Sequence, residues 1–516
     1  MKNNIFKTLL ILALPVTFVA CTDLEEVPLD GVSPQGGSSL PTADLLTLQS
    51  NISAFYNEWA HRIGITEMPG DAIAGPTRGG DWDDNAQLRQ IHGHQWAPDH
   101  PWIRDSYNKF MTGIFNADII LNTSSQSDIH PEAKFVKALM YYHMIDLFGQ
   151  VPYRDSYTDL TQDALVYSRS EAFDMAVMLA EEAHTGLLPK NAADASVISK
   201  DAAAMLLAKL YLNKAVFKSE AGATEYSHDA ADMTKVIQYV DGLSSSLNTD
   251  SNKAYAYWKN FDVSNDESNE IVFSLKKLVE GGATSKGDTQ YFWRMGQHYN
   301  QTPGGWNGPV ITAEFYNKYF DENDPRQEYS NDDIIARLGN PVGIQKGQVY
   351  APGGTEKVKD RNGNDLVFTP FTADIGLVVL DPVLIESAGY RSMKYIPGED
   401  QNNSANDLVV FRYSDALLMR AEAALRGGSG ADAQADLDAV RTRVGLATVS
   451  ASLESVMAER ARELWLEGWR RNDMIRQGTF LDAKSLKPSA SDPKYLIFPF
   501  PADALLNPNI TQNPGY

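Results

Sequence analysis

Cysteine is almost absent from this chain of 516 residues, since Cys21 is the only one. No disulfide within the chain can stabilise the fold, and no other thiol is available as a nucleophile. Basic residues are also few: 45 lysines and arginines face 67 aspartates and glutamates, which gives a formal net charge of −22 at pH 7. A charge of this sign argues against nucleic acid and against anionic lipid surfaces as partners.

The motifs of common catalytic and metal sites are missing as well. The chain has no serine nucleophile elbow, no phosphate-cradling glycine loop and no HExxH signature. His92, His94 and His100 lie close together in sequence, but we interpret them as ordinary polar surface groups rather than zinc ligands. Residues 360–365 (DRNGND) are rich in oxygen atoms, yet their glycine is misplaced for a calcium loop, so they predict a hairpin turn in which Asn-Gly supplies positive φ. We expect no metal and no cofactor.

The first twenty residues have the layout of a secretory signal. Lys2 and Lys7 precede an apolar run that is too short to span a bilayer, and the small residue Ala20 ends the segment. The sequence FVAC at residues 18–21 resembles a bacterial lipobox, whose cysteine is acylated. We therefore expect residues 1–20 to be a lipoprotein signal peptide and Cys21 to carry the lipid.

A different composition follows the cysteine. Residues 21–41 are rich in Pro, Gly and Ser and show no apolar periodicity, which predicts a flexible tether. No comparable linker interrupts the chain afterwards, so we expect residues 42–516 to form a single domain. Long irregular regions near residues 70–102 and 277–353 interrupt its helical pattern, and loops of such length are usually functional.

Apolar residues at three- and four-residue spacing predict a mostly α-helical protein. The strongest patterns cover residues 135–148, 201–215, 411–426 and 453–476. Small residues recur inside them, such as Ala202, Ala204 and Ala208, and allow neighbouring helices to approach closely. A framework of tetratricopeptide-like helix pairs is therefore expected.

Charged residues within the last of these patterns lie at helical neighbour spacing. The expected pairs are Glu459 with Arg462, Arg460 with Glu463, and Glu467 with Arg470 and Arg471. Glu463 and Glu467 could alternatively be the acid and base of a glycosidase. A general acid needs a raised pKa, whereas nearby arginines lower it, so we favour a structural role and expect no enzyme.

Many short motifs along the chain form a recognisable set. They are FGQVPY at 148–153, DPR at 324–326, Arg391, KY at 394–395, the segments 407–413 and 417–423, ER at 459–460, EL at 463–464, EGWR at 467–470, DMIRQG at 473–478, NP at 507–508 and QNPGY at 512–516. This set resembles the SusD/RagB family of outer-membrane nutrient-binding lipoproteins of Bacteroidota, over most of residues 21–516.

The resemblance implies a SusD-like fold and a lipoprotein that captures glycans at the cell surface without catalysis. It also implies a SusC-like TonB-dependent transporter as partner and anchoring in the outer membrane through Cys21, and the acidic residues after Cys21 resemble a surface-export signal. Peptide or glycopeptide capture, or a helix-repeat scaffold of a surface complex, are the alternatives.

Aromatic residues outside the helices are the candidate ligand contacts. Sugars present flat C–H faces edged by hydroxyls, which suits aromatic rings flanked by polar side chains. We interpret Trp59, Trp102, Trp465 and Trp469 as core residues. Acidic neighbours favour a neutral polymer such as a β-glucan or xyloglucan. The predicted glycan-binding residues are Trp82, Trp306, Trp293, Asp83, Asn85, Arg78, Tyr299 and Trp96.

Overall fold

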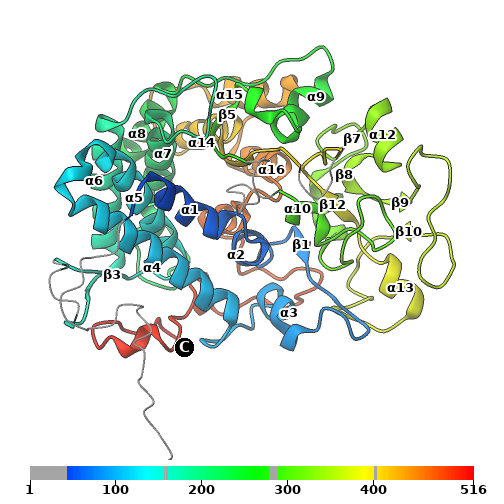
Figure 1. Ribbon diagram of the computed structural model, residues 1–516, viewed down its shortest axis with the longest axis horizontal. Helices are drawn as coiled ribbons and strands as arrows, with labels where there is room; N and C mark the ends of the chain where they lie inside the picture. The colour runs from blue at the N-terminus through cyan, green and yellow to red at the C-terminus, as the bar shows by residue number, and fades with distance from the viewer. Residues whose placement is uncertain (1–42, 156, 158–160, 278–288, 400–403) are drawn as a thin grey trace, which may run out of the picture.

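The computed structural model describes residues 43–155, 157, 161–277, 289–399 and 404–516 (Figure 1). The predicted signal peptide, Cys21 and the tether lie outside the described residues, and so does part of the irregular region 277–353. The described part contains 17 α-helices and 13 short strands, which confirms the mostly α-helical prediction. None of these helices is long and apolar enough to cross a membrane.

The α-helices have the following bounds: α1 Leu45–Tyr56, α2 Trp59–Thr66, α3 Gln87–His92, α4 Pro101–Leu121, α5 His130–Leu147, α6 Arg169–Gly186, α7 Lys200–Phe217, α8 Ala230–Asp241, α9 Lys253–Trp258, α10 Tyr291–Arg294, α11 Ala313–Tyr319, α12 Asp332–Leu338, α13 Pro382–Ser387, α14 Tyr413–Leu425, α15 Ala433–Arg443, α16 Leu453–Glu463 and α17 Arg470–Gln477. Short 3-10 helices cover Asp84–Ala86, Ser124–Ile129, Lys259–Phe261, Asn265–Glu267, Pro493–Leu496 and Ala504–Leu506.

The strands are short and form small separate sheets. Their bounds are β1 Ile73–Ala74, β2 Thr77–Arg78, β3 Val151–Tyr153, β4 Leu165–Tyr167, β5 Ile271–Leu275, β6 Val310–Ile311, β7 Glu328–Tyr329, β8 Val342–Gln345, β9 Gly347–Gln348, β10 Val367–Phe368, β11 Val378–Val379, β12 Arg391–Met393 and β13 Leu408–Arg412. The pairs β1–β6, β3–β4, β5–β13 and β9–β10 are antiparallel, β2–β11 is parallel, and β12–β8–β7 form a three-stranded antiparallel sheet.

Helix pairs make up one side of the molecule. Helices α4 to α8 pack consecutively against one another, and α14 packs on α8, α15 and α16. Alanines of α7 such as Ala203 and Ala208 are fully buried, which permits this close approach. Strands β7 to β10 with α12 and α13 lie on the opposite side, at the right of Figure 1. One hydrophobic cluster, from Ala43 to Ile510, takes side chains from both sides.

The predicted helix over residues 453–476 is interrupted. Helix α16 ends at Glu463 and α17 begins at Arg470, while Leu466 (φ 56°) and Gly468 (φ 84°) adopt left-handed backbone conformations between them. Backbone nitrogens of Gly468 and Trp469 donate to the buried carboxylate of Glu67 at 2.6 and 3.2 Å. These long-range bonds satisfy two of the amide groups that the break leaves outside a helix.

Most of the predicted neighbour pairs in this segment are wrong. Glu459 does contact Arg462 at 3.1 Å. The other side chains are buried and find partners on distant elements instead: Arg460 with Asp415 and Asp473, Glu463 with Arg326, Arg412 and Arg443, Glu467 with Lys394 and Arg412, Arg470 with Asp71, and Arg471 with Asp146. Against the effect of burial, the surrounding arginines hold the pKa of Glu463 well below its usual range.

The prediction of a turn at residues 360–365 is confirmed, whereas the prediction that three histidines are surface groups is wrong. The predicted turn at residues 360–365 is confirmed, because Oδ1 of Asp360 accepts hydrogen bonds from the backbone of Asn362 and Asn364, and Gly363 has φ 87°. Asn362 itself does not take a positive φ. His92, His94 and His100 are not surface groups: all three are buried, and each has a ring nitrogen hydrogen-bonded to a backbone carbonyl.

Candidate functional site

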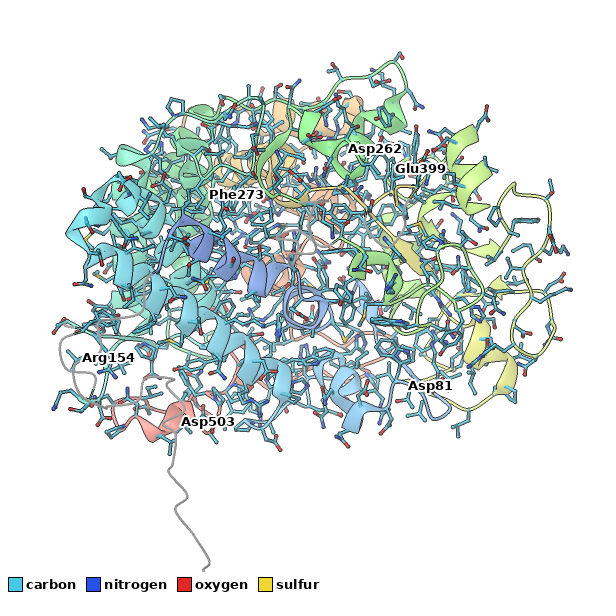
Figure 2. All side chains as sticks on the ribbon, in the orientation of Figure 1. Asp81, Arg154, Asp262, Phe273, Glu399 and Asp503 are labelled. Atoms are coloured by element: carbon cyan, nitrogen blue, oxygen red, sulfur yellow. The ribbon has the colours of Figure 1, made fainter. Side chains whose placement is uncertain are left out.

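Two strand pairs bring distant loops together at one end of the molecule. Pairing of β1 with β6 sets Ala74 opposite Val310, and pairing of β2 with β11 sets Arg78 opposite Val379. The loops that follow or precede these strands therefore meet in space. Figure 2 shows Asp81 at the lower right, on the side of the molecule remote from the helix pairs.

An open groove lies where these loops meet. It has a volume of about 410 Å³ and is lined by Asp81, Trp82, Asp84, Tyr299, Trp306 and Arg361. The indole of Trp306 is 43% exposed, the largest exposed fraction among tryptophans of the described residues. The groove thus presents aromatic faces beside two carboxylates and one guanidinium, which can accept and donate hydrogen bonds at the edge of a flat ligand.

The backbone around Trp306 is held in place while its ring is left open. Its amide donates to the carbonyl of Arg294 at 2.8 Å, and its carbonyl accepts from Nε1 of Trp82 at 2.7 Å. The ring of Tyr291 lies at a centroid distance of 6.1 Å from that of Trp306. An aromatic ring whose position is fixed before binding loses little conformational entropy when a ligand stacks on it.

Trp82 occupies its place because Gly308 has no side chain. A Cβ atom at Gly308 would lie 2.4 Å from the indole of Trp82, so only glycine permits this contact. Trp82 has a left-handed backbone conformation with φ 62°. Three of the four residues that follow it, Asp84, Asn85 and Ala86, also have positive φ. Such a run is uncommon outside glycine and is found at sites where the surrounding structure enforces a particular side-chain placement.

A buried carboxylate anchors the cationic wall of the groove. Oε1 of Glu386 accepts from Nε of Arg361 at 2.7 Å, and Oε2 of the same carboxylate lies 2.6 Å from Nε2 of His298. The guanidinium of Arg361 in turn lies 4.4 Å from the ring centroid of Tyr299. The hydroxyl of Tyr299 donates to Asp81 at 3.2 Å. The chain of contacts therefore links a buried acid to three groove residues, Arg361, Tyr299 and Asp81.

The protonation state of this network follows from its hydrogen bonds. Nδ1 of His298 accepts from the backbone amide of Asn300 at 3.1 Å, so the proton of a neutral ring is on Nε2 and is donated to Glu386. Burial lowers the pKa of His298, which favours this neutral ring. Burial opposes ionisation of Glu386, but hydrogen bonds from Arg361 and His298 leave its pKa below the ordinary value.

The structure brings together three of the predicted site residues. Trp82, Trp306 and Tyr299 line the groove. Asp83 and Asn85 are exposed in the same loop but do not line it, and Asp83 pairs with Arg89 at 2.9 Å.

The other three predicted residues are buried and do not reach the groove. Trp293 is 1% exposed and lies in the hydrophobic core, and Nε1 of Trp96 donates to the hydroxyl of Tyr516 at 2.8 Å inside that core. Arg78 is buried, and its guanidinium donates to the carbonyls of Ile385 and Ala388. Arg78 thus holds the C-terminal end of α13 in place instead of lining the groove.

Four residues at the groove were not predicted as site residues. Asp81 and Asp84 flank Trp82 in sequence, so the same polar loop could have indicated them. Tyr291 lies on α10 beside Trp306. Arg361 lies in the hairpin at residues 360–365, more than fifty residues away from the tryptophan loops, and no local signal connects it with them.

Tryptophans predicted to be in the core do lie there. Trp59, Trp465 and Trp469 are buried, and Trp102 is half-buried with its ring against that of Trp59 at a centroid distance of 6.1 Å. Trp258 is also fully buried, and its Nε1 donates to the carbonyl of Pro325. Exposure therefore distinguishes Trp306 from these buried tryptophans.

Two family models match this chain. The model of the SusD family matches residues 269–516, and a model described as starch-binding associating with outer membrane matches residues 75–212. The chain belongs to the SusD family, as the sequence motifs predicted.

Curated relatives are distant but extend over most of the chain. The starch-binding protein SusD of Bacteroides thetaiotaomicron is 24% identical over 84% of this chain and 82% of that protein. The SusD-like protein P2 of Formosa agariphila is 22% identical over 98% of both.

Solved structures share the fold. A laminarin binding SusD-like protein has a TM-score of 0.66 at 22% identity and covers 91% of this chain and 98% of its own. Surface glycan-binding protein A from Bacteroides thetaiotaomicron, solved in complex with laminarihexaose, has a TM-score of 0.62 at 17% identity and covers 92% and 100%. The SusD-like fold predicted from the sequence is thereby confirmed.

Proposed function

We propose that this protein is a cell-surface lipoprotein that captures a glycan without catalysis and passes it to a SusC-like TonB-dependent transporter. The observation that carries the proposal is the convergence of Trp82, Trp306 and Tyr299 in one open groove, from loops more than 200 residues apart in sequence. Membership of the SusD family supports it, and so do relatives named for starch, laminarin and surface glycan binding. Lipid anchoring through Cys21 completes the proposal.

Stacking energy in such a groove suits capture followed by release. Burying about 100 Å² of sugar and ring surface is worth roughly 2.5 kcal/mol before ordering costs. Two or three rings therefore give binding in the millimolar to micromolar range. A protein that hands its ligand to a transporter must also let it go, and tighter binding would slow that step.

The charges around the groove favour a neutral glycan. Asp81 and Asp84 line it, Asp83 is exposed beside it, and the single groove cation, Arg361, is already paired with Glu386. A polymer of uronates would face these carboxylates, whereas hydroxyls of a neutral sugar can donate hydrogen bonds to them. We therefore propose a neutral polymer such as a β-glucan or xyloglucan.

Titration calorimetry tests the proposal. The protein without residues 1–21 is titrated with laminarin, xyloglucan, starch, pectin and alginate, and the tightest ligand is tested again on Trp306→Ala and Trp306→Phe. We expect saturable binding to a neutral polymer, a loss of roughly tenfold or more in the alanine variant, and a smaller loss in the phenylalanine variant, because a smaller aromatic face remains.

Leu188→Ala is the control variant for Trp306→Ala. Leu188→Ala removes another exposed apolar side chain, 78% exposed and on the helix-pair side, and should bind like the wild type. Binding that does not depend on Trp306 would reject the groove as the site. Tighter Trp306-dependent binding to pectin or alginate would reject the neutral class, and heat with peptides alone would favour peptide capture.

The transport step has its own test. Deleting the transporter should abolish glycan uptake by cells while the purified lipoprotein still binds. Uptake that continues without the transporter would contradict the proposed hand-over. Release of shorter sugars from the polymer over time would show an enzyme instead of a binding protein.

A further inference from the structure

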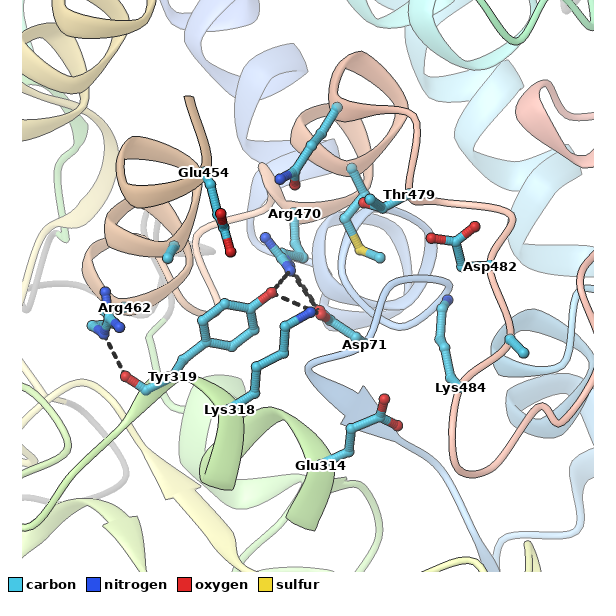
Figure 3. Close-up of a pocket in the computed structure, with 14 residues that line it drawn as sticks. Asp71, Glu314, Lys318, Tyr319, Glu454, Arg462, Arg470, Thr479, Asp482 and Lys484 are labelled. Atoms are coloured by element: carbon cyan, nitrogen blue, oxygen red, sulfur yellow. Dashed lines mark hydrogen bonds and ion pairs between the residues drawn. The ribbon is translucent and has the colours of Figure 1, made fainter. Parts of the chain in front are cut away.

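A second pocket lies apart from the groove, between α11, α16, α17 and residues 479–484 (Figure 3). Its volume is about 390 Å³, which falls within the range of small-ligand sites. None of the residues that line the groove lines this pocket. Its lining is charged and includes four bases and four acids: Arg470, Lys484, Lys318, Arg462, Asp71, Glu314, Glu454 and Asp482.

Arg470 brings an unpaired donor to this pocket. Its Nε and Nη2 atoms each donate to a different oxygen of Asp71 at 2.7 Å, and Nη2 lies at the same distance from the hydroxyl oxygen of Tyr319. Arg470 is only 5% exposed. Its remaining nitrogen, Nη1, is buried and has no hydrogen-bond partner among the described residues. A buried donor without a partner costs about 1–3 kcal/mol, so its persistence is a reason to expect a ligand oxygen there.

Two lysines line the pocket with Arg470, and burial lowers the pKa of one of them, Lys484, to about 7. Lys484 is buried, and its ammonium donates to the carbonyls of Pro69 and Gly70 at 2.6 and 2.8 Å. Lys318 is exposed, and Nζ lies 5.2 Å from the ring centroid of Tyr319. Figure 3 shows the side chain of Lys318 extending toward Asp71 and Arg470. Asp71 and Glu314 are the acids beside them: Asp71 is paired with Arg470, and Glu314 accepts from the backbone amide of Ser485 at 2.6 Å. The donors left for a ligand are therefore Nη1 of Arg470 and the ammonium of Lys318.

The rim of the pocket has the opposite character. Glu454 and Asp482 are exposed, and neither forms an ion pair within the described part of the chain. Gln477 and Thr479 supply further polar atoms. A ligand that fills the pocket must therefore accept hydrogen bonds at the floor and donate them at the rim.

We propose that this pocket is a second ligand site, for a small carboxylate that carries hydrogen-bond donors next to its carboxyl group. The carboxylate accepts from Nη1 of Arg470 and from the ammonium of Lys318, as charge-assisted hydrogen bonds to arginine favour. The adjacent hydroxyl or ammonium groups donate to Glu454 and Asp482. A hexuronate and a free amino acid both have this chemistry.

Met474 offers a reporter inside the pocket. With ¹³C-methyl-labelled methionine, its signal is identified by its disappearance in Met474→Leu. Glucuronate, alanine and glucose are then titrated separately. We expect a saturable shift of the Met474 signal with glucuronate, with alanine or with both, and none with glucose, which lacks the carboxylate. Which of the two carboxylates binds identifies the source of the ligand.

Lys318 is the residue to change, because it is exposed and its loss should leave the fold intact. Lys318→Gln should raise the Kd of the carboxylate roughly fivefold, as expected for removing one charge near a partly hydrated ion. Lys253→Gln changes an exposed lysine elsewhere and should have no effect. Trp306→Ala should also leave this titration unchanged, which separates the pocket from the groove.

Three results would overturn the proposal. They are no saturable Met474 shift with either carboxylate, an equal shift with glucose, or an unchanged Kd in Lys318→Gln. Each result is independent of whether the groove binds a glycan, because the Met474 methyl reports on the pocket alone.

Discussion

At the scale of single residues, Glu386 influences the groove geometry without lining the groove. It is 2% exposed and holds Arg361, which lies over Tyr299. Glu386→Gln removes the charge that fixes the guanidinium, so glycan affinity should fall about threefold to tenfold. Calorimetry with the neutral glycan measures it.

A double-mutant cycle shows whether Glu386 acts through Arg361. If it does, Glu386→Gln combined with Arg361→Ala should bind no more weakly than Arg361→Ala alone. Additive losses would mean that Glu386 supports binding by another route. Asp333→Asn, which weakens the ion pair between the exposed Asp333 and the half-buried Arg337, serves as the matched control and should not change affinity.

Glu67 should give the fold a distinct pH dependence. Burial raises the pKa of Glu67 to about 7, although backbone amides of Gly468 and Trp469 donate to it. In the unfolded chain its pKa is about 4.3. Between these values the folded protein binds more protons, so this group makes the free energy of unfolding fall as pH rises from about 4.3 to about 7.

Glu67→Gln removes that contribution because the amide cannot ionise. Urea denaturation of both proteins at pH 4 and pH 8 gives the free energies of unfolding. Relative to the variant, the wild type should lose on the order of 3 kcal/mol between these pH values. Parallel pH dependence of the two proteins would contradict the raised pKa.

Residue chemistry explains which site residues the sequence could predict. Trp82 and Trp306 lie among polar and glycine residues, a composition that predicted recognition loops, and the structure places both at one open groove. Trp293 and Trp96 have similar surroundings in sequence but are buried. Their burial depends on distant partners, such as the hydroxyl of Tyr516 that accepts from Trp96, and no local pattern reveals such a contact.

At the level of elements, the loop before β6 depends on one glycine. Gly308→Ala would place Cβ 2.4 Å from the Trp82 ring and displace either the ring or the backbone of Trp306. Overpacking of this kind costs about 1–3 kcal/mol, and glycan affinity should fall about tenfold. Thermal denaturation and calorimetry measure the two effects.

Gly80→Ala is the matched control for that change. Gly80 lies in the adjoining loop, and a Cβ there would meet nothing within 4 Å. We expect wild-type affinity and stability. If Gly308→Ala were as harmless as Gly80→Ala, the contact between Gly308 and Trp82 would not be what positions the groove.

Helices and breaks differ in how far the sequence reveals them. Periodicity correctly predicted α5, α7 and α14, because amphipathic patterning is a local property. The same periodicity continues through residues 464–469, where the structure has a break. The break is held by Glu67, about 400 residues away, so helical spacing alone could not have located it.

At the scale of the whole molecule, a buried network of charges connects the helix pairs with the strands. Arg412 contacts Glu270, Glu463 and Glu467 and is 1% exposed. Arg412→Met would leave three buried carboxylates with one cation fewer, so the free energy of unfolding should fall by about 3–5 kcal/mol or more. Chemical denaturation provides the measurement.

A surface arginine provides the control for the loss of stability expected in Arg412→Met. Arg104→Met breaks an exposed pair with Asp105 and should cost about 1 kcal/mol or less. Equal losses for the two variants would show that the buried network contributes no more than a surface pair. The family motifs around residues 459–478 would then need another structural explanation.

The groove is where we expect a glycan to stack, and a crystal structure of the protein bound to its tightest neutral oligosaccharide tests this most directly. We predict a sugar ring parallel to the indole of Trp306, about 4 Å from it, with hydroxyls hydrogen-bonded to Asp81, Asp84 or Arg361. A sugar bound elsewhere on the molecule, with Trp306 free of contact, would contradict the account.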